Sequence, residues 1–283
     1  MTTSGKAVSV HDRLLKKAHA TGEDFNLLLT HYTLERFLYR TSVSTHKDQF
    51  LLKGALLFDL WFDTPQRPTR DVDFLGLVSS DLEGMATVMR EVCSIECDDG
   101  LVFLGDSVRA HEIREETSYG GIRVDLLGML GNARCPVQID IGFGDAVTPG
   151  PIDVLFPTIL KDNPAPALRA YPKETVIAEK LDAIVSLGMA NSRMKDYFDL
   201  HLLLSEPNLN MESVHMAVSA TFTRRKTAIP KDLPIGLTDE FAANSQKILQ
   251  WNAFLKKNRI VAPALSVVVE TISSKVGKLI RSS

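Results

Sequence analysis

Apolar and polar residues alternate strictly in three segments of the chain, at 71–74, 122–126 and 137–141. A period of two is typical of β-strands that have one buried face. Residues 81–93, which lie between the first two segments, have the spacing of a helix instead. The pattern therefore predicts strands around one helix over residues 70–155.

The region before these strands has mostly helical spacing. Ser9 and Asp12 are spaced as in a capping box, which predicts a helix over residues 9–20. A second amphipathic helix follows from Phe25. A short apolar run then stops at Gly54, and residues 55–62 are apolar enough for a buried helix.

The region after the strands differs in character. The proline-rich residues 163–166 mark a boundary, because proline interrupts regular structure. Beyond it, periodic segments indicate helices that start near Pro172, Met194, Met211, Thr238 and Ala262. We therefore predict an α+β protein, with a mixed-sheet domain and its N-terminal helices at residues 1–162 and a helical domain at residues 163–283.

Composition narrows the class of protein. The 283 residues are 45% hydrophobic and 24% charged, as is usual for a globular protein. No apolar run reaches the roughly 18 residues of a membrane span, and the N-terminal residues lack the apolar core of a secretory signal. The three cysteines form no CxxC pair, which favours reduced, buried thiols. We expect a cytoplasmic protein without a membrane partner.

The charge is distributed unevenly, although its net value is only −3. From Glu206 to Ser283 there are 11 lysines and arginines against 6 aspartates and glutamates, so acidic residues dominate the rest of the chain. A basic C-terminal region favours contact with a polyanion such as RNA. Chance variation between solvated faces is the alternative.

Three aspartates are the strongest chemical signal. Asp71 and Asp73 are two residues apart in one strand and so share a face, and Asp140 occupies the polar face of another. If the two strands are neighbours, three carboxylates converge, and such a cluster repels itself unless a cation neutralises it. Hard oxygen ligands suit Mg²⁺ or Mn²⁺, and two such ions serve phosphoryl transfer. A solvated strand face is the alternative.

Two further features are compatible with phosphate binding. The turn at Lys53, Gly54 and Ala55 has small residues where a strand enters a helix, which lets the backbone approach a phosphate. In the helix from Pro172, Lys180 lies within an apolar stripe, where a lysine is costly unless an anion meets it. A lysine at the edge of the stripe that reaches solvent is the alternative.

These residues resemble the signature of the DNA polymerase β-like nucleotidyltransferase superfamily. That signature is a glycine-containing helix start, an Asp-x-Asp strand and a third aspartate on a later strand. The chain is more specifically similar to the AbiEii/AbiGii toxin family, from about residue 25 to residue 260. The similar segments are FLLKGALLFDLW, RPTRDVDF, VQIDIGFGD, YPKETVIAEKLDAIV, RMKDYFDL and TFTRRKTAIP.

The resemblance implies a nucleotidyltransferase that moves a nucleotide from an NTP to a macromolecular acceptor, such as RNA and in some relatives the tRNA 3′ end. It also implies a toxin role in a type IV toxin–antitoxin or abortive-infection pair, with an antitoxin partner. Ala55 stands where the family usually has glycine or serine, so it offers no hydroxyl to a phosphate.

The resemblance also suggests roles for the helical region. It makes the triphosphate the partner of Lys180, and it makes Asp199 a candidate to orient Lys180 or the acceptor hydroxyl. Arg193 is a weaker candidate for a phosphate contact. Asp196, in the same motif, has the alternative of a structural pair with Arg193 or Lys195.

The basic segment Arg224, Arg225 and Lys226 is a candidate for RNA backbone contacts, although exposed charge on an ordinary helix explains it equally well. Two other functions stay open at this level. A carboxylate cluster with two ions also serves a nuclease or phosphodiesterase. A nucleotide- or RNA-binding module without catalysis is the second alternative.

Overall fold

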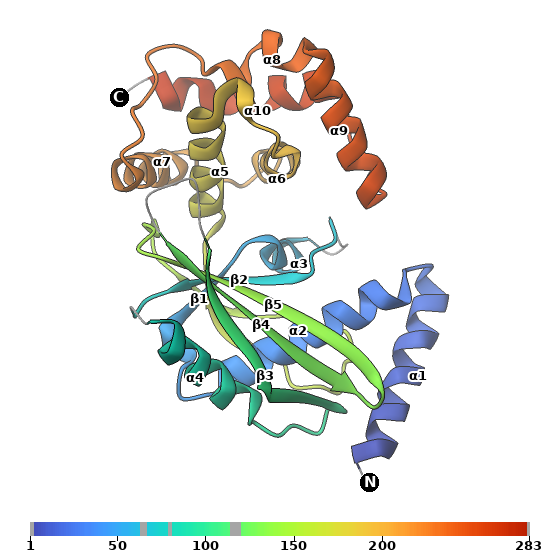
Figure 1. Ribbon diagram of the computed structural model, residues 1–283. Helices are drawn as coiled ribbons and strands as arrows, with labels where there is room; N and C mark the ends of the chain where they lie inside the picture. Colours follow the sequence, from blue (N-terminus) through green and yellow to red (C-terminus); the bar gives the residue numbers. More distant parts are fainter. Residues whose placement is uncertain (1–2, 63–66, 79–80, 114–119, 282–283) are drawn as a thin grey trace. The chain divides into compact units, whose positions relative to one another are not determined.

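The computed structural model describes residues 3–62, 67–78, 81–113 and 120–281 (Figure 1). The chain forms two compact units. The first comprises Met1–Gly144 and Ile152–Ala170, and the second comprises Asp145–Pro151 and Tyr171–Ser283. The first contains a mixed sheet with helices and the second is helical, which confirms the predicted α+β class.

Within the described residues, the first unit has a seven-stranded sheet in the order β3-β4-β5-β2-β1-β7-β6. β2 pairs in parallel with β5 and antiparallel with β1, so the sheet is mixed at its centre. The strands are β1 (Phe50–Lys53), β2 (Asp71–Gly76), β3 (Leu101–Ile113), β4 (Gly121–Leu130), β5 (Ala133–Phe143), β6 (Ile152–Leu155) and β7 (Ala167–Ala170).

The three alternating segments lie in β2, β4 and β5, as predicted. β3 did not stand out in the sequence because its alternation fails part way along. Leu101 and Phe103 are buried, but the pairing with β4 then shifts register between Leu104 and Arg109. An irregularity of this kind moves later side chains to the other face and hides the strand's period.

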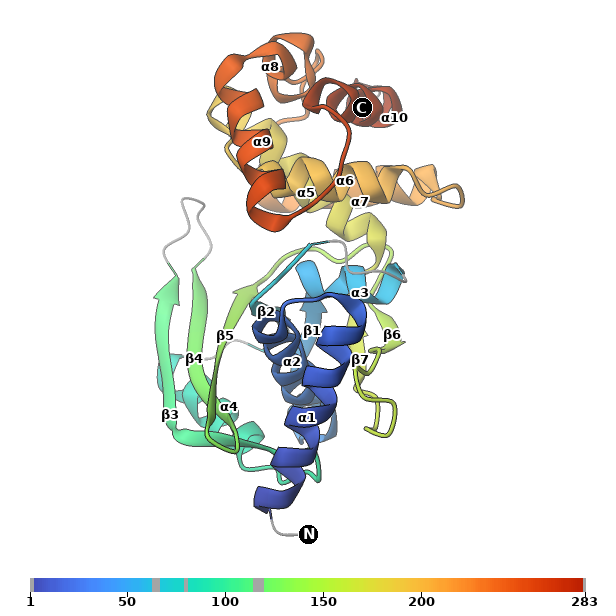
Figure 2. The ribbon, with the colours of Figure 1, turned by 90° about the vertical axis from the view of Figure 1, so that its right-hand side faces the viewer.

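Helices cover one face of this sheet. α2 (Phe25–Val43) packs against β5 and β7, and α4 (Leu82–Cys93) packs against β3 and β4 (Figure 2). The ring of Phe37 on α2 contacts the ring of Phe103 on β3 at a centroid distance of 5.6 Å. Buried side chains of β2, β4 and β5 face these helices, so the alternate residues of the same strands occupy the opposite face.

The N-terminal helix is longer than predicted. α1 runs over Thr3–Thr21 and begins six residues before Ser9, so the Ser9–Asp12 spacing is not its cap. Ala7, Val10, Leu14 and Ala18 are all buried at helical spacing, and this continuous apolar stripe extends the helix toward the N-terminus. The predicted helix over 55–62 is a short 3₁₀ turn (Ala55–Leu57) followed by α3 (Phe58–Trp61).

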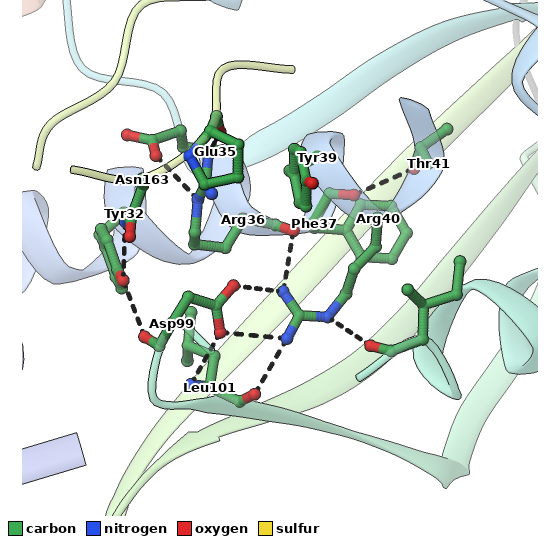
Figure 3. A network of polar contacts seen from close by, with 12 residues as sticks. Tyr32, Glu35, Arg36, Phe37, Tyr39, Arg40, Thr41, Asp99, Leu101 and Asn163 are labelled. Carbon is green, nitrogen blue, oxygen red and sulfur yellow. Dashed lines mark hydrogen bonds and ion pairs between the residues drawn. The ribbon is translucent and has the colours of Figure 1, made fainter. Parts of the chain in front are cut away.

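Two buried arginines of α2 tie distant segments to the sheet unit (Figure 3). Arg40 binds Asp99 through two nitrogens, at 2.6 and 3.1 Å, and also donates to the carbonyl oxygens of Ile95 and Leu101. Arg36 donates to the carbonyl oxygen of Pro164 at 2.8 Å. These bonds fix the start of β3 and the proline-rich stretch against α2.

Glu35, the neighbour of Arg36, is also buried (Figure 3). One of its carboxylate oxygens accepts a hydrogen bond from the Ile159 backbone N–H at 2.6 Å. Burial raises the pKa of Glu35 to about 7, although the Arg36 guanidinium opposes that rise. This polar layer was not visible from the sequence, where the same residues look like the exposed charges of an ordinary helix.

In the second unit, helices pack around an apolar core. The helices are α5 (Lys173–Leu187), α6 (Met194–Leu204), α7 (Met211–Arg225), α8 (Asp239–Ala243), α9 (Ser245–Asn258) and α10 (Leu265–Arg281). α5 packs against α6 and α7, and α10 packs against α6 and α8. Asn244 ends the segment that starts near Thr238, and its side chain caps α9.

The structure keeps residues 163–170 with the sheet unit, beyond the boundary predicted at 162/163. β7 lies in this stretch and pairs in parallel with β1, with Leu52 opposite Ala170, so backbone hydrogen bonds hold it to the sheet.

Among the described helices, none is long and apolar enough to cross a membrane. All three cysteines are free thiols; Cys93 and Cys135 are buried, as predicted, whereas Cys97 is partly exposed.

Candidate active site

The polar face of the sheet brings three aspartates together. Asp71 and Asp73 share one face of β2. The parallel pairing of β2 with β5 sets Asp73 directly beside Asp140. Oxygen atoms of the three carboxylates lie within 4.8 Å of one another, and all three residues are half-buried. Neighbouring strands, which the sequence analysis had to assume, therefore place the predicted carboxylates in one cluster.

An arginine that the sequence analysis did not select lies against this cluster. Arg123 of β4 is directly opposite Asp140 of β5 in the antiparallel pairing. Its Nε donates to Oδ1 of Asp140 at 2.7 Å and its Nη2 donates to Oδ2 at 2.6 Å. The two parallel hydrogen bonds form the bidentate pair that arginine makes with carboxylates. The hydrogen bond to Asp140 raises the pKa of Arg123 above its usual value.

Asp71 has a different partner. The hydroxyl of Thr69, two residues earlier, donates to Oδ1 of Asp71. Thr69 is itself buried, and its carbonyl oxygen lies 3.2 Å from Nε2 of His31 on α2. Hydrogen bonds of this kind orient a carboxylate and limit its rotation. Thr69, which itself contacts His31, therefore orients Asp71 at the start of β2.

The glycine turn lies directly against Asp73. Gly54 has φ +76°, a conformation that favours glycine. A Cβ atom built on Gly54 would lie only 1.9 Å from Oδ2 of Asp73. Glycine is therefore required here to make room for a carboxylate. Ala55, which follows, is buried.

Lys53 is on the same face. Its Cα pairs with that of Asp73 across β1 and β2, and its Nζ lies 3.3 Å from the place where a Cβ on Gly142 would be. The ammonium group thus reaches the strand that carries Asp140. The helical turns after Gly54 are too short for the helix-terminal phosphate site that the sequence suggested, so Lys53 is the better phosphate candidate.

The donor set fits a divalent cation. It consists of carboxylate oxygens only, which Mg²⁺ and Mn²⁺ prefer, and the three residues are accessible enough to exchange ions. The converging carboxylates also repel one another, which a cation would relieve. Asp71, Asp73 and Asp140 are the residues that would hold it.

The second unit contains a separate charged cluster. Nζ of Lys180 on α5 lies 3.0 Å from Oδ1 of Asp196 and 2.7 Å from Oδ2 of Asp199, both on α6. Both aspartates are fully buried, whereas the Lys180 side chain is 13% exposed. The anions that meet Lys180 in its apolar stripe are thus two carboxylates of the same unit. Asp199 thus bonds Lys180 directly, and the predicted role of orienting that lysine stays a prediction.

Arg193 also belongs to this cluster. It forms the structural pair with Asp196 that the sequence offered as an alternative. Its Nε donates to Oδ2 of Asp196 at 2.6 Å. Burial alone would raise the pKa of Asp196, but the adjacent Lys180 and Arg193 outweigh burial and lower that pKa below its usual value. Asp196 therefore carries a buried charge between two cations.

The three basic residues at the end of α7 do not share one environment. Arg224 and Lys226 are exposed. Arg225 turns inward and pairs with Asp145, Glu179 and Asp182 at 3.0, 3.3 and 3.1 Å. Burial opposes the charge of Arg225, but Glu179 and Asp145 outweigh it and raise the Arg225 pKa. Its ion pairs give Arg225 a structural role within the second unit.

Sequence reasoning missed Arg123 and Thr69 although both carried a signal. Arg123 occupies a polar position of an alternating strand, in the same phase as Asp125. Its relevance depends on which strand lies next to β4, and alternation alone does not specify that. Thr69 is two residues before Asp71, where a hydroxyl can bond a nearby carboxylate.

Comparisons with known proteins agree with this geometry. A family model described as "Nucleotidyl transferase AbiEii toxin, Type IV TA system" matches residues 36–272. A crystal structure from H. pylori, provisionally assigned as a nucleotidyltransferase, is 17% identical with a TM-score of 0.50, covering 90% of this chain and 94% of its own. The Helicobacter pylori protein JHP933 is also 17% identical, with a TM-score of 0.48 and coverages of 90% and 91%. A comparison with curated proteins found no match.

The first of these structures, with its TM-score of 0.50, supports similarity of fold alone at 17% identity. The family match is evidence of function as well as of fold, because it spans most of the chain. The matched residues include the aspartate cluster, Lys180 and Asp199. The protein is therefore an enzyme of the nucleotidyltransferase class. The chain belongs to the AbiEii family of nucleotidyltransferase toxins from type IV toxin–antitoxin systems.

Proposed function

We propose that this enzyme is a divalent-metal-dependent nucleotidyltransferase that moves an NMP from an NTP to RNA, with tRNA 3′ ends as the first acceptor class to test. The observation that carries the proposal is the register of β2 and β5. It sets Asp73 beside Asp140 and, with Asp71, gathers three carboxylates within 4.8 Å on one face of the sheet. Membership of a nucleotidyltransferase family supports the same reaction.

In this proposal Asp71, Asp73 and Asp140 would hold the divalent ions, and Asp140 would also help to activate the acceptor hydroxyl. Bound Mg²⁺ or Mn²⁺ supplies activation of the attacking oxygen and stabilisation of the leaving pyrophosphate. The acceptor oxygen forms a bond to the α-phosphorus as the bond from that phosphorus to the bridging oxygen breaks. Pyrophosphate leaves, and the hydroxyl proton passes to Asp140 or to water.

The remaining candidates bind and orient phosphate. Lys53 lies on the face of the aspartate cluster and is suited to meet triphosphate charge, beside the turn at Gly54 and Ala55. In the second unit, Lys180 and Arg193 are cationic candidates for phosphate contacts, and the 2.7 Å bond from Lys180 to Asp199 supports an orienting role for Asp199. Arg224 and Lys226 are the exposed candidates for RNA backbone contacts.

The family's toxin–antitoxin classification implies an antitoxin partner. We place the enzyme in the bacterial cytoplasm, where it would act as a growth-inhibiting toxin. An RNA that carries an added nucleotide at its end would no longer function, and this would inhibit growth. Expression of the active enzyme without its antitoxin should therefore slow growth.

The deciding experiment follows the label of each α-³²P-labelled NTP after incubation with the protein, total RNA and Mg²⁺. We expect label on RNA with the wild type, and a loss of at least about 100-fold with Asp73→Asn, because a metal ligand is removed. Asp153→Asn is the matched control, since Asp153 is an exposed carboxylate of β6 in the same unit; it should label RNA as the wild type does.

Other outcomes separate the rival functions. RNA that becomes shorter without taking up label would indicate a nuclease. NTP binding by calorimetry without transfer to RNA or protein would indicate a binding module. Asp73→Asn with unchanged transfer would contradict the proposed site.

A further inference from the structure

The Arg123–Asp140 pair is an unusual feature of a site proposed to bind metal. Both oxygens of Asp140 accept hydrogen bonds from the guanidinium, at 2.7 and 2.6 Å. When the Gln138 amide is oriented so that its oxygen faces Arg123, that oxygen accepts from Nη2 and Nε at 3.1 and 3.3 Å. Arg123 is thus bonded to two side chains of β5, directly at the aspartate cluster.

Backbone pairing fixes this contact. Arg123 and Asp140 are Cα partners in the antiparallel pairing of β4 with β5, so their side chains leave the same face of the sheet next to each other. The parallel pairing of β5 with β2 then places Asp73 on the other side of Asp140. Asp140 therefore lies between an arginine and the other two carboxylates.

A guanidinium and a divalent ion compete for such a carboxylate. An ion that binds Asp140 needs an oxygen lone pair that faces the other two aspartates, and two like charges on one carboxylate repel each other strongly at a half-buried site. Arg123 must then move away or tolerate the ion at a cost in metal affinity. In the absence of metal, the same arginine relieves the repulsion among the three carboxylates.

We propose that Arg123 is an internal counter-ion of the aspartate cluster, which competes with the divalent ion for Asp140 and so sets the metal concentration at which the site loads. This inference rests on the proposed metal-dependent function and concerns its regulation. Arg123 is in this view a positioning residue for Asp140, and it keeps the metal-free protein folded while raising the ion concentration that catalysis requires.

The test measures Mn²⁺ binding alone, by isothermal titration calorimetry without nucleotide. Arg123→Met should bind Mn²⁺ about 10-fold more tightly than the wild type, because the competing charge is gone while an unbranched side chain remains. Arg109→Met is the matched control. Arg109 lies on β3 and donates to the backbone carbonyls of Asp106 and Val108, so its removal takes away the same charge elsewhere on the sheet.

A second background shows whether the effect passes through Asp140. In Asp140→Asn protein the Arg123→Met change should give no gain in Mn²⁺ affinity, because the contested carboxylate is absent. Metal-free Arg123→Met should melt at a lower temperature than the wild type and recover more on addition of Mn²⁺. If Arg123→Met fails to fold, Arg123→Gln serves instead, since glutamine removes the charge but retains a donor for Asp140.

The Mn²⁺ affinities of these variants decide whether Arg123 acts as the counter-ion. Equal or weaker Mn²⁺ affinity in Arg123→Met, or the same gain in Arg109→Met or in the Asp140→Asn background, overturns the counter-ion role. Wild-type binding of Mn²⁺ with an unchanged Arg123→Met affinity overturns this inference and leaves the proposed function standing. No Mn²⁺ binding by any variant overturns the proposed metal dependence and the inference together. Binding by Arg123→Met but not by the wild type supports the inference in its strongest form.

Discussion

At the scale of single residues, the candidate active site depends on how charge and space are matched around three carboxylates. Arg123 and Lys53 bring positive charge to the face that carries Asp71, Asp73 and Asp140. Gly54 supplies the space, because its backbone passes so close to Asp73 that no side chain fits. The cluster therefore relies on neighbours that are not metal ligands.

Replacing Gly54 with alanine tests the space requirement. Alanine at the Gly54 backbone angles of φ 76° and ψ −151° costs roughly 1–3 kcal/mol of stability, because this region is nearly exclusive to glycine. Its Cβ would also displace Asp73, and we expect Mn²⁺ affinity to fall at least about 10-fold and RNA labelling to fall with it.

Gly22→Ala is the control for a side chain placed at positive φ away from the aspartate cluster. Gly22 has φ +74°, and nothing lies within 4 Å of the place of its Cβ. Gly22→Ala should lower the melting temperature, because it also sets a side chain at positive φ, and it should leave Mn²⁺ affinity unchanged. Equal Mn²⁺ affinity in the two variants would show that Asp73 needs no such clearance.

At the scale of elements, α5 and α6 of the second unit are joined by a buried ion cluster as well as by apolar packing. Lys180 on α5 meets Asp196 and Asp199 on α6, and Arg193 binds Asp196 just before α6 begins. A lysine in an apolar stripe suggests at first that methionine would stabilise the helix pair. The buried carboxylates reverse that expectation, because they would lose their cation.

We therefore expect Lys180→Met to destabilise the protein by about 3–5 kcal/mol at pH 7.5. The deficit should shrink on acidification. In the wild type the pKa of Asp196 is lowered, so its stabilising contribution is present above the unfolded pKa and lost only as the pH falls through the lower folded value. In Lys180→Met the buried carboxylates take up protons at higher pH, which relieves the uncompensated charge.

Urea unfolding at pH 7.5 and pH 5 measures this difference. Lys195→Met is the control, because Lys195 is an exposed lysine of α6, and it should change stability little at either pH. Wild-type stability in Lys180→Met with reduced NTP turnover would contradict the structural cluster and favour a role in phosphate binding alone.

At the scale of the whole molecule, the basic residues that are in excess after Glu206 are spread over several elements and do not form one site. Much of it lies on exposed side chains, but Arg225 does not contribute, because three carboxylates of its own unit surround it. Of the three basic residues at the end of α7, Arg224 and Lys226 are thus the ones that an RNA backbone can reach.

If RNA contacts this segment, the double change Arg224→Ala and Lys226→Ala should make the plot of log affinity against log salt shallower by up to about 1.4, because each lost phosphate contact removes about 0.7 from the slope for single strands. Fluorescence anisotropy with a labelled single-stranded RNA measures the slope. Lys16→Ala with Lys17→Ala removes the same charge from α1 and should leave the slope unchanged.

Arg225→Ala should behave differently from both double variants. It leaves the buried Asp182 and the half-buried Asp145 and Glu179 without their cation, so the melting temperature should fall. Arg225→Ala could instead lose more RNA affinity than the Arg224 and Lys226 double variant while keeping the same melting temperature as that variant. This result would assign the RNA contact to Arg225.

The sequence by itself determined what depends on near neighbours in the chain. Alternation identified β2, β4 and β5, and the two-residue spacing put Asp71 and Asp73 on one face. Helical spacing located most helices of the second unit. These properties follow from the local geometry of strands and helices, which repeats every two or 3.6 residues whatever the remainder of the chain does.

Only the tertiary structure decided which strands are neighbours and in what register. The β2–β5 pairing joins Asp73 to Asp140 across 67 positions, and the β4–β5 pairing sets Arg123 against Asp140. Likewise, the burial of Arg36, Arg40 and Arg225 depends on carboxylates and carbonyls from distant segments. Strand order and ion pairing result from packing between remote parts of the chain, and no local period records that packing.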